Sequence, residues 1–162
     1  MKILIIQTAF IGDVVLATSL VDFIKKNIST SKIDFLLRKG NESLLKDHPQ
    51  INNVLIWNKN KGKYLNLFKM AFDARKEKYD LVLNIQRFTS SGIFMAFCGA
   101  KMKVGFKQNP LSFFFHHRVD HKIPHFHGDT YYHEVQRNLQ LLAPVIKDFK
   151  IPPPKELKPN IF

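Results

Sequence analysis

The stretch KILIIQTAFIGDVVLATSLVDFIKK, residues 2–26, predicts a buried strand that turns directly into a helix. Its first part is a short run of Ile and Leu, which is typical of a strand covered on both faces. From residue 13 to about 28, apolar side chains return at spacings of three and four, the period of a helix with one buried face. Gly12 and a lone carboxylate, Asp13, lie at the turn between the two.

The same alternation of short apolar runs and helical periods continues along the chain. Further strands are expected at 32–38, 53–58, 80–85 and 101–106, and further helices at 41–47, 64–78, 89–98 and 129–146. Strands that alternate with helices predict parallel strands joined by right-handed crossovers. We therefore expect an α/β fold, a Rossmann-like doubly wound parallel sheet, over residues 1–150.

The last segment, IPPPKELKPNIF at residues 151–162, carries four of the eight prolines of the chain. Such a segment cannot continue a helix and favours extended backbone. We expect it to be a linker that leads to a further domain.

Charge and composition narrow the class of partner. Lys and Arg number 25 against 13 Asp and Glu, a net charge of +12, which favours an anionic partner such as nucleic acid, an acidic glycolipid or a membrane surface. The single cysteine, Cys98, has apolar neighbours and is expected to be a buried thiol. No signal peptide and no transmembrane span is recognised, so a cytoplasmic protein is expected.

Several common signatures are absent from the sequence. It contains neither GxGxxG nor GxxxxGK[ST], which argues against a dinucleotide-binding or ATP-hydrolysing domain. No nucleic-acid-binding motif accompanies the positive charge, so nucleic acid is not expected as the partner.

Ligands of an open parallel sheet bind outside the carboxyl ends of its strands. The strand ends and the turns that follow them are expected to place acidic, basic, amide and small residues there. These residues are Thr8, Gly12, Asp13, Lys59, Lys61, Lys63, Gln86 and Arg87. So many cations at one edge predict a phosphate or a sugar acid between them, although a solvated basic face stays open for each lysine. Arg87 is the strongest candidate, because it directly follows a strand and can bind an acid with two hydrogen bonds.

Asp13 has two interpretations. As a helix cap, it would accept backbone N–H bonds and complement the helix dipole. As a general base, it would lie at the mouth of the crevice within reach of a substrate hydroxyl.

Two aromatic and basic segments also have more than one interpretation. Six of the seven histidines lie within residues 116–133, but their spacing matches no familiar ligand pattern, so no metal is expected there. Some of these imidazoles are expected to line the crevice or a partner surface. The run from Phe113 to Phe115 could contact a membrane interface or pack beneath another segment.

Four stretches together resemble glycosyltransferase family 9, the lipopolysaccharide heptosyltransferases and their relatives. They are residues 2–26; PQINNVLIWNK; YDLVLNIQRFTSSGIFMAFCGAKMKVGF; and HEVQRNLQLL. The strand into an IGD turn and the YDLVLNIQ strand are the most specific of these features.

The resemblance implies the N-terminal, acceptor-binding half of a GT-B glycosyltransferase, with the C-terminal donor domain absent from this chain. It implies that Asp13 is the catalytic base of an inverting, metal-independent transfer. It also implies that the residues expected at the sheet edge hold the acidic inner core of lipopolysaccharide, a Kdo–lipid A type acceptor. The donor, ADP-heptose in the expected case, would bind the other half, so the isolated chain is expected to be inactive and to need no cofactor of its own.

The resemblance further implies a cytoplasmic enzyme, with peripheral contact at the inner membrane left open. The alternative is a non-catalytic module that binds anionic glycolipid or a partner protein through the same basic edge.

Overall fold

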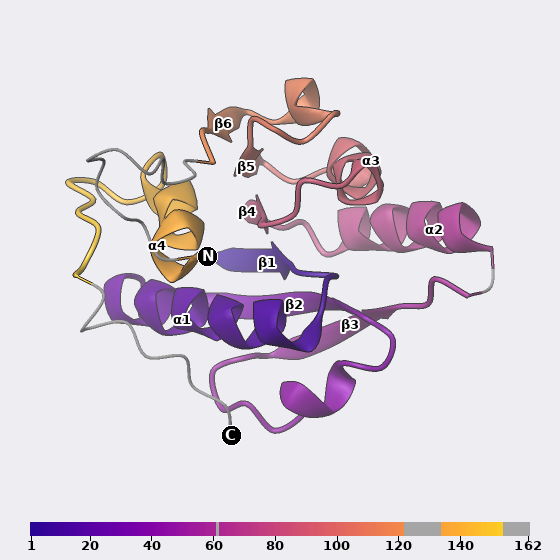
Figure 1. Ribbon diagram of the computed structural model, residues 1–162, viewed down its shortest axis with the longest axis horizontal. Helices are drawn as coiled ribbons and strands as arrows, with labels where there is room; N and C mark the ends of the chain where they lie inside the picture. Colours follow the sequence, from indigo (N-terminus) through magenta and orange to yellow (C-terminus); the bar gives the residue numbers. More distant parts are fainter. Residues whose placement is uncertain (61, 122–133, 154–162) are drawn as a thin grey trace, which may run out of the picture.

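The computed structural model describes residues 1–60, 62–121 and 134–153, and its centre is a six-stranded sheet (Figure 1). Every pairing is parallel, and the strand order is β3-β2-β1-β4-β5-β6. The strands are β1 Lys2–Ile6, β2 Lys32–Arg38, β3 Asn53–Trp57, β4 Leu81–Asn84, β5 Met102–Phe106 and β6 His117–Val119.

Helices cover both faces of this sheet (Figure 1). The α-helices are α1 Ile11–Asn27, α2 Lys63–Lys76, α3 Thr89–Phe97 and α4 Glu134–Leu139. Short 3-10 helices follow at η1 Glu42–Leu44, η2 Ser112–Phe114 and η3 Gln140–Leu142.

The strands are apolar on both sides because each side meets a different helical layer. In β1, Ile3 and Ile5 pack into the core that α1 and α4 cover, whereas Leu4 and Ile6 pack into the core that α2 and α3 cover. Continuous apolar strands of this kind are what a buried parallel sheet requires. The expected doubly wound α/β fold is confirmed.

The strand order reverses at β1, which pairs with β2 on one side and with β4 on the other. Successive connections leave opposite faces of the sheet on the two sides of this point. The carboxyl ends of β1 and β4 therefore flank a crevice, which is the usual place for a ligand in such a sheet.

Strand β6 was not expected from the sequence. It has only three residues, two of them exposed, so it shows neither a buried apolar run nor a clear alternation. The three phenylalanines before it differ in burial. Phe115 is buried and packs over Gly105, where a Cβ atom would lie 2.6 Å from its ring, whereas Phe113 and Phe114 stay exposed.

Two expected helices differ from those observed. The segment 41–47 contains only the 3-10 helix η1. Within 129–146, the described part is α4 followed by η3, and residues 129–133 lie outside the described residues. Pro144 has no amide N–H to donate to the carbonyl oxygen of Gln140, so a regular α-helix could not continue through this segment.

The thiol of Cys98 is buried, as expected, and burial raises its pKa. No helix in the described ranges is both long enough and apolar enough to cross a membrane. Of the expected linker, residues 154–162 lie outside the described residues.

Candidate functional site

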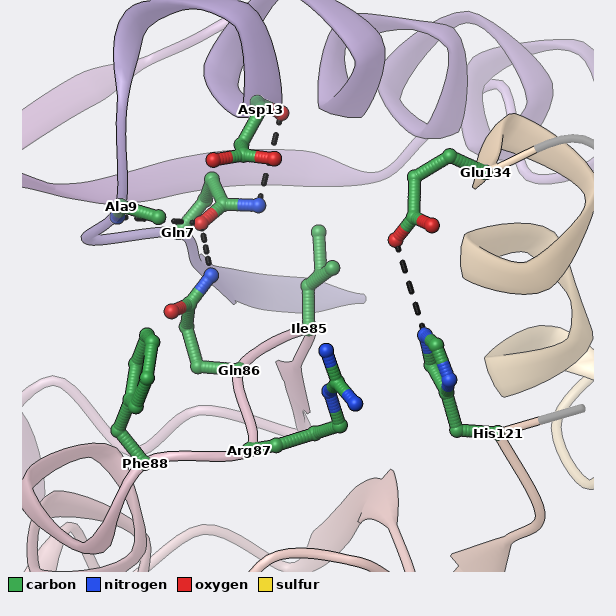
Figure 2. Close-up of a pocket in the computed structure, with 9 residues that line it drawn as sticks. All are labelled: Gln7, Ala9, Asp13, Ile85, Gln86, Arg87, Phe88, His121 and Glu134. Atoms are coloured by element: carbon green, nitrogen blue, oxygen red, sulfur yellow. Dashed lines mark hydrogen bonds and ion pairs between the residues drawn. The ribbon is translucent and has the colours of Figure 1, made fainter. Parts of the chain in front are cut away.

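A pocket of about 390 Å³ opens at the carboxyl ends of β1 and β4, at the point where the strand order reverses (Figure 2). Its lining comes from the ends of β1, β4 and β6 and from the starts of α1 and α4. The lining residues are Gln7, Ala9, Asp13, Ile85, Gln86, Arg87, Phe88, His121 and Glu134.

Asp13 lies in the first turn of α1 and is not the capping residue, which is Phe10. Its Oδ2 atom accepts the backbone N–H of Phe10 at 3.2 Å, so the carboxylate reaches back over the start of the helix. Among the described residues, Oδ1 accepts no hydrogen bond. One oxygen thus stabilises the helix start, while the other is available to a ligand.

Two buried glutamines hold this wall of the pocket together. The side-chain amide of Gln86 donates to Oε1 of Gln7, which joins the ends of β4 and β1. The same Oε1 accepts the N–H of Ala9 at 3.2 Å, and Nε2 of Gln7 approaches the carbonyl oxygen of Asp13 at 3.5 Å. The start of α1 is therefore braced against both strands. We call Gln7, Asp13 and Gln86 the amide wall.

The loop that carries Arg87 is fixed from behind by Asn109. The Nδ2 group of Asn109 donates to the carbonyl oxygens of Gln86, at 3.2 Å, and Phe88, at 3.0 Å. Helix α3 comes so close that a Cβ atom on Gly92 would lie 2.4 Å from Oδ1 of Asn109, so a side chain there would displace this brace. Arg87 itself is exposed at the pocket.

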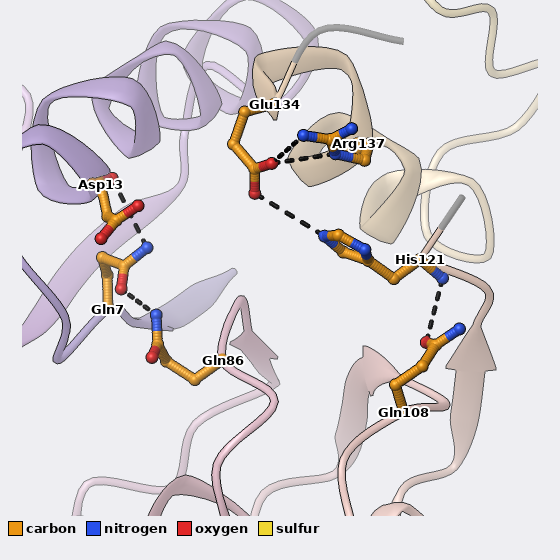
Figure 3. Close-up of polar contacts among 7 residues, drawn as sticks. All are labelled: Gln7, Asp13, Gln86, Gln108, His121, Glu134 and Arg137. Carbon is orange, nitrogen blue, oxygen red and sulfur yellow. Dashed lines mark hydrogen bonds and ion pairs between the residues drawn. The ribbon is translucent and has the colours of Figure 1, made fainter. Parts of the chain in front are cut away.

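The opposite side of the pocket is formed by His121, after β6, and Glu134, at the start of α4 (Figure 3). Nε2 of His121 lies 3.7 Å from Oε1 of Glu134, and Arg137 donates through Nε to Oε2 of the same carboxylate at 2.9 Å. We call His121 and Glu134 the ion-pair wall. No motif in the sequence predicted this pair, although a histidine of segment 116–133 was expected to line the crevice.

The surroundings of Glu134 keep it ionised. The His121 imidazole is the largest cause and Arg137 adds to it, and together they overcome the opposing effect of burial and lower the pKa of Glu134 to about 2. The pocket therefore presents a carboxylate on each of two walls, with the Arg87 guanidinium between them (Figure 2).

The basic loop after β3 is placed beside the pocket and not in its lining. Nζ of Lys59 donates to the carbonyl oxygen of Thr8 at 2.9 Å and lies over the ring of Trp57. Burial is the largest cause that lowers the pKa of Lys59, with smaller contributions from Arg38 and Lys63. Lys59 thus supports the chain that follows β1.

The remaining predicted site residues are not brought into the described lining. Lys63 is exposed at the start of α2, and Gly12 is exposed in the first turn of α1. Thr8 is buried, and its hydroxyl has no hydrogen-bond partner within the described ranges. Lys61 lies outside the described residues. The structure brings together Asp13, Gln86 and Arg87.

Within the described ranges, no group of three His, Cys, Asp or Glu side chains is placed to hold a metal ion. Most of segment 116–133 lies outside these ranges. The described groups can instead accept a proton or a hydroxyl hydrogen bond, through the carboxylates, and bind an acid, through Arg87.

Comparison with known proteins finds relatives of similar sequence. The chain is 31% identical over 147 residues to lipopolysaccharide heptosyltransferase 3 of Escherichia coli (strain K12), an alignment that covers 85% of this chain and 41% of the relative. It is 28% identical over 117 residues to lipopolysaccharide heptosyltransferase 1 of Campylobacter coli, covering 72% of this chain and 34% of that protein. The chain thus spans well under half the length of these relatives.

Solved structures share the fold. The E. coli ADP-heptose lps heptosyltransferase II matches with a TM-score of 0.76 and 18% identity, covering all of this chain and 46% of that one. The E. coli heptosyltransferase WaaC with ADP-2-deoxy-2-fluoro heptose matches with a TM-score of 0.75 and 17% identity, covering 94% and 50%.

The model of the family described as glycosyltransferase family 9 (heptosyltransferase) matches residues 67–159, more than half of the chain. The chain therefore belongs to glycosyltransferase family 9, as its sequence motifs indicated.

Proposed function

We propose that this chain is the acceptor-binding half of an inverting, lipopolysaccharide heptosyltransferase-like enzyme. The proposal rests on the presence of Asp13 and Arg87 in the lining of one pocket, at the point where the strand order of the sheet reverses. A base and an acid-binding cation in one pocket suit an acceptor that has both a reacting hydroxyl and an acidic group.

In the proposed reaction, Asp13 removes the proton of the acceptor hydroxyl as its oxygen attacks the anomeric carbon of the donor. The bond between that carbon and the phosphate oxygen of the nucleoside diphosphate breaks. The configuration at the carbon inverts, and the nucleoside diphosphate leaves with the bonding electrons. The N–H of Phe10 fixes one oxygen of Asp13 and thereby orients the other. Arg87 binds the carboxylate or phosphate of the acceptor and places its hydroxyl near the base.

The acceptor is proposed to be the Kdo-containing inner core of lipopolysaccharide, and the donor a nucleotide sugar such as ADP-heptose. The names of the relatives support lipopolysaccharide as the class of acceptor, and one structural neighbour is named with an ADP-heptose analogue, which supports the donor. The donor is proposed to bind outside residues 1–162, which by themselves would then not transfer a sugar. Transfer without a metal, on the cytoplasmic face of the inner membrane, completes the proposal.

A hybrid enzyme tests the role of Asp13. Residues 1–162 would replace the matching half of the E. coli enzyme that they resemble, and transfer of heptose to a Kdo–lipid A acceptor would be measured. Asp13→Asn should lower the rate by about 100-fold or more, because a general base typically contributes this much, while acceptor affinity stays within about threefold. Asp73→Asn is the matched control, since Asp73 is exposed on α2 and pairs only with Lys76 among the described residues.

A rate that survives in the Asp13→Asn hybrid would refute the assignment of the base. Loss of acceptor binding in the same variant would instead show that Asp13 serves the fold of the pocket.

A further inference from the structure

We propose that Glu134 selects the acceptor, by accepting a hydrogen bond from an acceptor hydroxyl on the wall opposite Asp13. This inference rests on the proposed function, because it takes the pocket to be the acceptor site. It assigns a role to a side chain that the proposed transfer step does not use.

Glu134 lies where a ligand of the pocket can reach it. Glu134 lines the same pocket as Asp13 and Arg87, and its side chain extends from the start of α4 into the space between the two walls (Figure 2). The side chain keeps 32% of its exposure, so a ligand can reach it.

The two carboxylate oxygens of Glu134 have different partners. Arg137 occupies Oε2 through both Nε and Nη2. Oε1 faces Nε2 of His121 at 3.7 Å as one half of the ion pair, and no other described residue donates to its second lone pair. Oε1 therefore has a lone pair available to a donor in the pocket.

The side chain of Glu134 is held in place by its neighbours. His121 is 8% exposed, its ring stands at right angles to that of Phe106 with the centroids 4.7 Å apart, and its backbone N–H donates to Oε1 of Gln108 at 3.0 Å. With Arg137 on its other oxygen, Glu134 is held from two sides. A side chain fixed in this way can discriminate between ligands, because little conformational entropy is lost when it binds. His121 is a positioning residue in this account.

The charges then orient the acceptor. An acidic group is repelled by the carboxylates of Asp13 and Glu134 and attracted by Arg87 between them. Hydroxyl groups are the acceptor's donors, and Glu134 can take one of them. The preferred ligand is therefore a polyhydroxylated sugar acid whose acid group and recognised hydroxyl lie on different edges of the ring.

The test uses the whole chain and a methyl glycoside of Kdo together with its series of monodeoxy analogues, with affinities measured by calorimetry. The readout is the ratio of the dissociation constants for a deoxy analogue and the parent sugar. Overall affinity is not the readout, because removal of Glu134 also removes a negative charge that repels the acid group of the ligand.

The wild-type chain should bind at least one deoxy analogue about 10-fold more weakly than the parent, as expected when a charged acceptor loses its donor. Glu134→Ala should bind that analogue and the parent equally. Glu134→Gln, which keeps the size of the side chain, should retain a ratio of about threefold because a neutral amide oxygen accepts more weakly. Glu77→Ala, an exposed acid paired with Lys2, should keep the full ratio.

Three results would overturn the inference. If Glu134→Ala and Glu134→Gln keep the wild-type ratio for every analogue, Glu134 reads no hydroxyl, and the proposed function stands. If the wild type binds the parent sugar but discriminates against no analogue, the inference is also wrong and the proposed function again stands. If the wild type does not bind the parent sugar at all, the inference and the proposed function fail together. A thermal melt of each variant identifies loss of fold, and Glu134→Gln then decides the outcome.

Discussion

The two walls of the pocket are built in different ways. The amide wall joins the ends of β1 and β4 to the start of α1 through neutral side-chain amides, and both of its glutamines are buried. The ion-pair wall joins the segment after β6 to α4 through charged and titratable groups. We infer that the two walls have different roles. The amide wall fixes the position of Asp13, and the ion-pair wall binds hydroxyl groups of the ligand and repels its acid group.

Arg87→Gln should have the largest effect on binding, because it removes the cation between the walls. Affinity for a Kdo glycoside should fall about 10- to 100-fold, the value of a charge-assisted hydrogen bond, and affinity for its carboxyl-reduced analogue should not change. Arg118→Gln, an exposed arginine on β6, is the control. Equal losses for the acid and the reduced analogue would show that Arg87 does not bind the acid.

Gln7→Leu breaks the amide wall. It leaves the buried amide of Gln86 and the N–H of Ala9 without their acceptor, so the free energy of unfolding should fall by about 1–3 kcal/mol. Urea unfolding measures this change. Gln108→Leu is the comparison, because Gln108 accepts the backbone N–H of His121 in the ion-pair wall. This substitution should cost about 0.5 kcal/mol or less because Gln108 is exposed. The division between the walls would be contradicted if the two substitutions cost the same.

Acid should weaken the ion-pair wall selectively. The pKa of Glu134 is about 2 in the folded chain, below the ordinary value of 4.5, so its contribution to stability is complete above pH 4.5 and is lost as the pH falls toward 2. The difference in unfolding free energy between wild type and Glu134→Gln should therefore shrink over that window. Parallel pH curves for the two proteins would show that Glu134 gains nothing from His121 and Arg137.

The basic loop should matter least. Lys63→Ala should change acceptor affinity by less than about twofold, because the side chain is exposed and outside the described lining. Lys59→Ala should reduce it by about threefold, since Lys59 holds the carbonyl oxygen of Thr8 next to the amide wall. A larger effect at Lys63 than at Lys59 would place the acid-binding site in this loop and not at Arg87. Calorimetric titration of both variants measures the order.

Most of the fold could be predicted because the sheet is buried on both faces. Strands such as β1 and β4 then read as continuous apolar runs, and the helices between them carry the matching period. Strand β6 could not be predicted in this way, since it is short and mostly exposed at the edge. It is defined by its pairing with β5, which is a property of the folded chain.

The site was predictable to the extent that it follows from strand ends. Gln86 and Arg87 follow β4, Asp13 lies in the first turn of the helix that follows β1, and the topology brings them to one edge. Gln7 was missed because a single polar residue just after an apolar strand carries no distinctive signal. His121 and Glu134 were missed as a pair because their meeting depends on how α4 packs beside β6, which no local spacing encodes. Positive charge drew attention to Lys59 and Lys63, whose contacts lie outside the pocket lining.

The central claim is that this chain holds the acceptor and not the nucleotide. Titration of the purified chain with a Kdo-containing lipid A acceptor, and in parallel with ADP and ADP-heptose, at two salt concentrations, tests it most directly. We expect acceptor binding that weakens with salt and with Arg87→Gln, and no binding of either nucleotide. Nucleotide binding without acceptor binding would contradict the account, because it would make this chain the donor half of the enzyme.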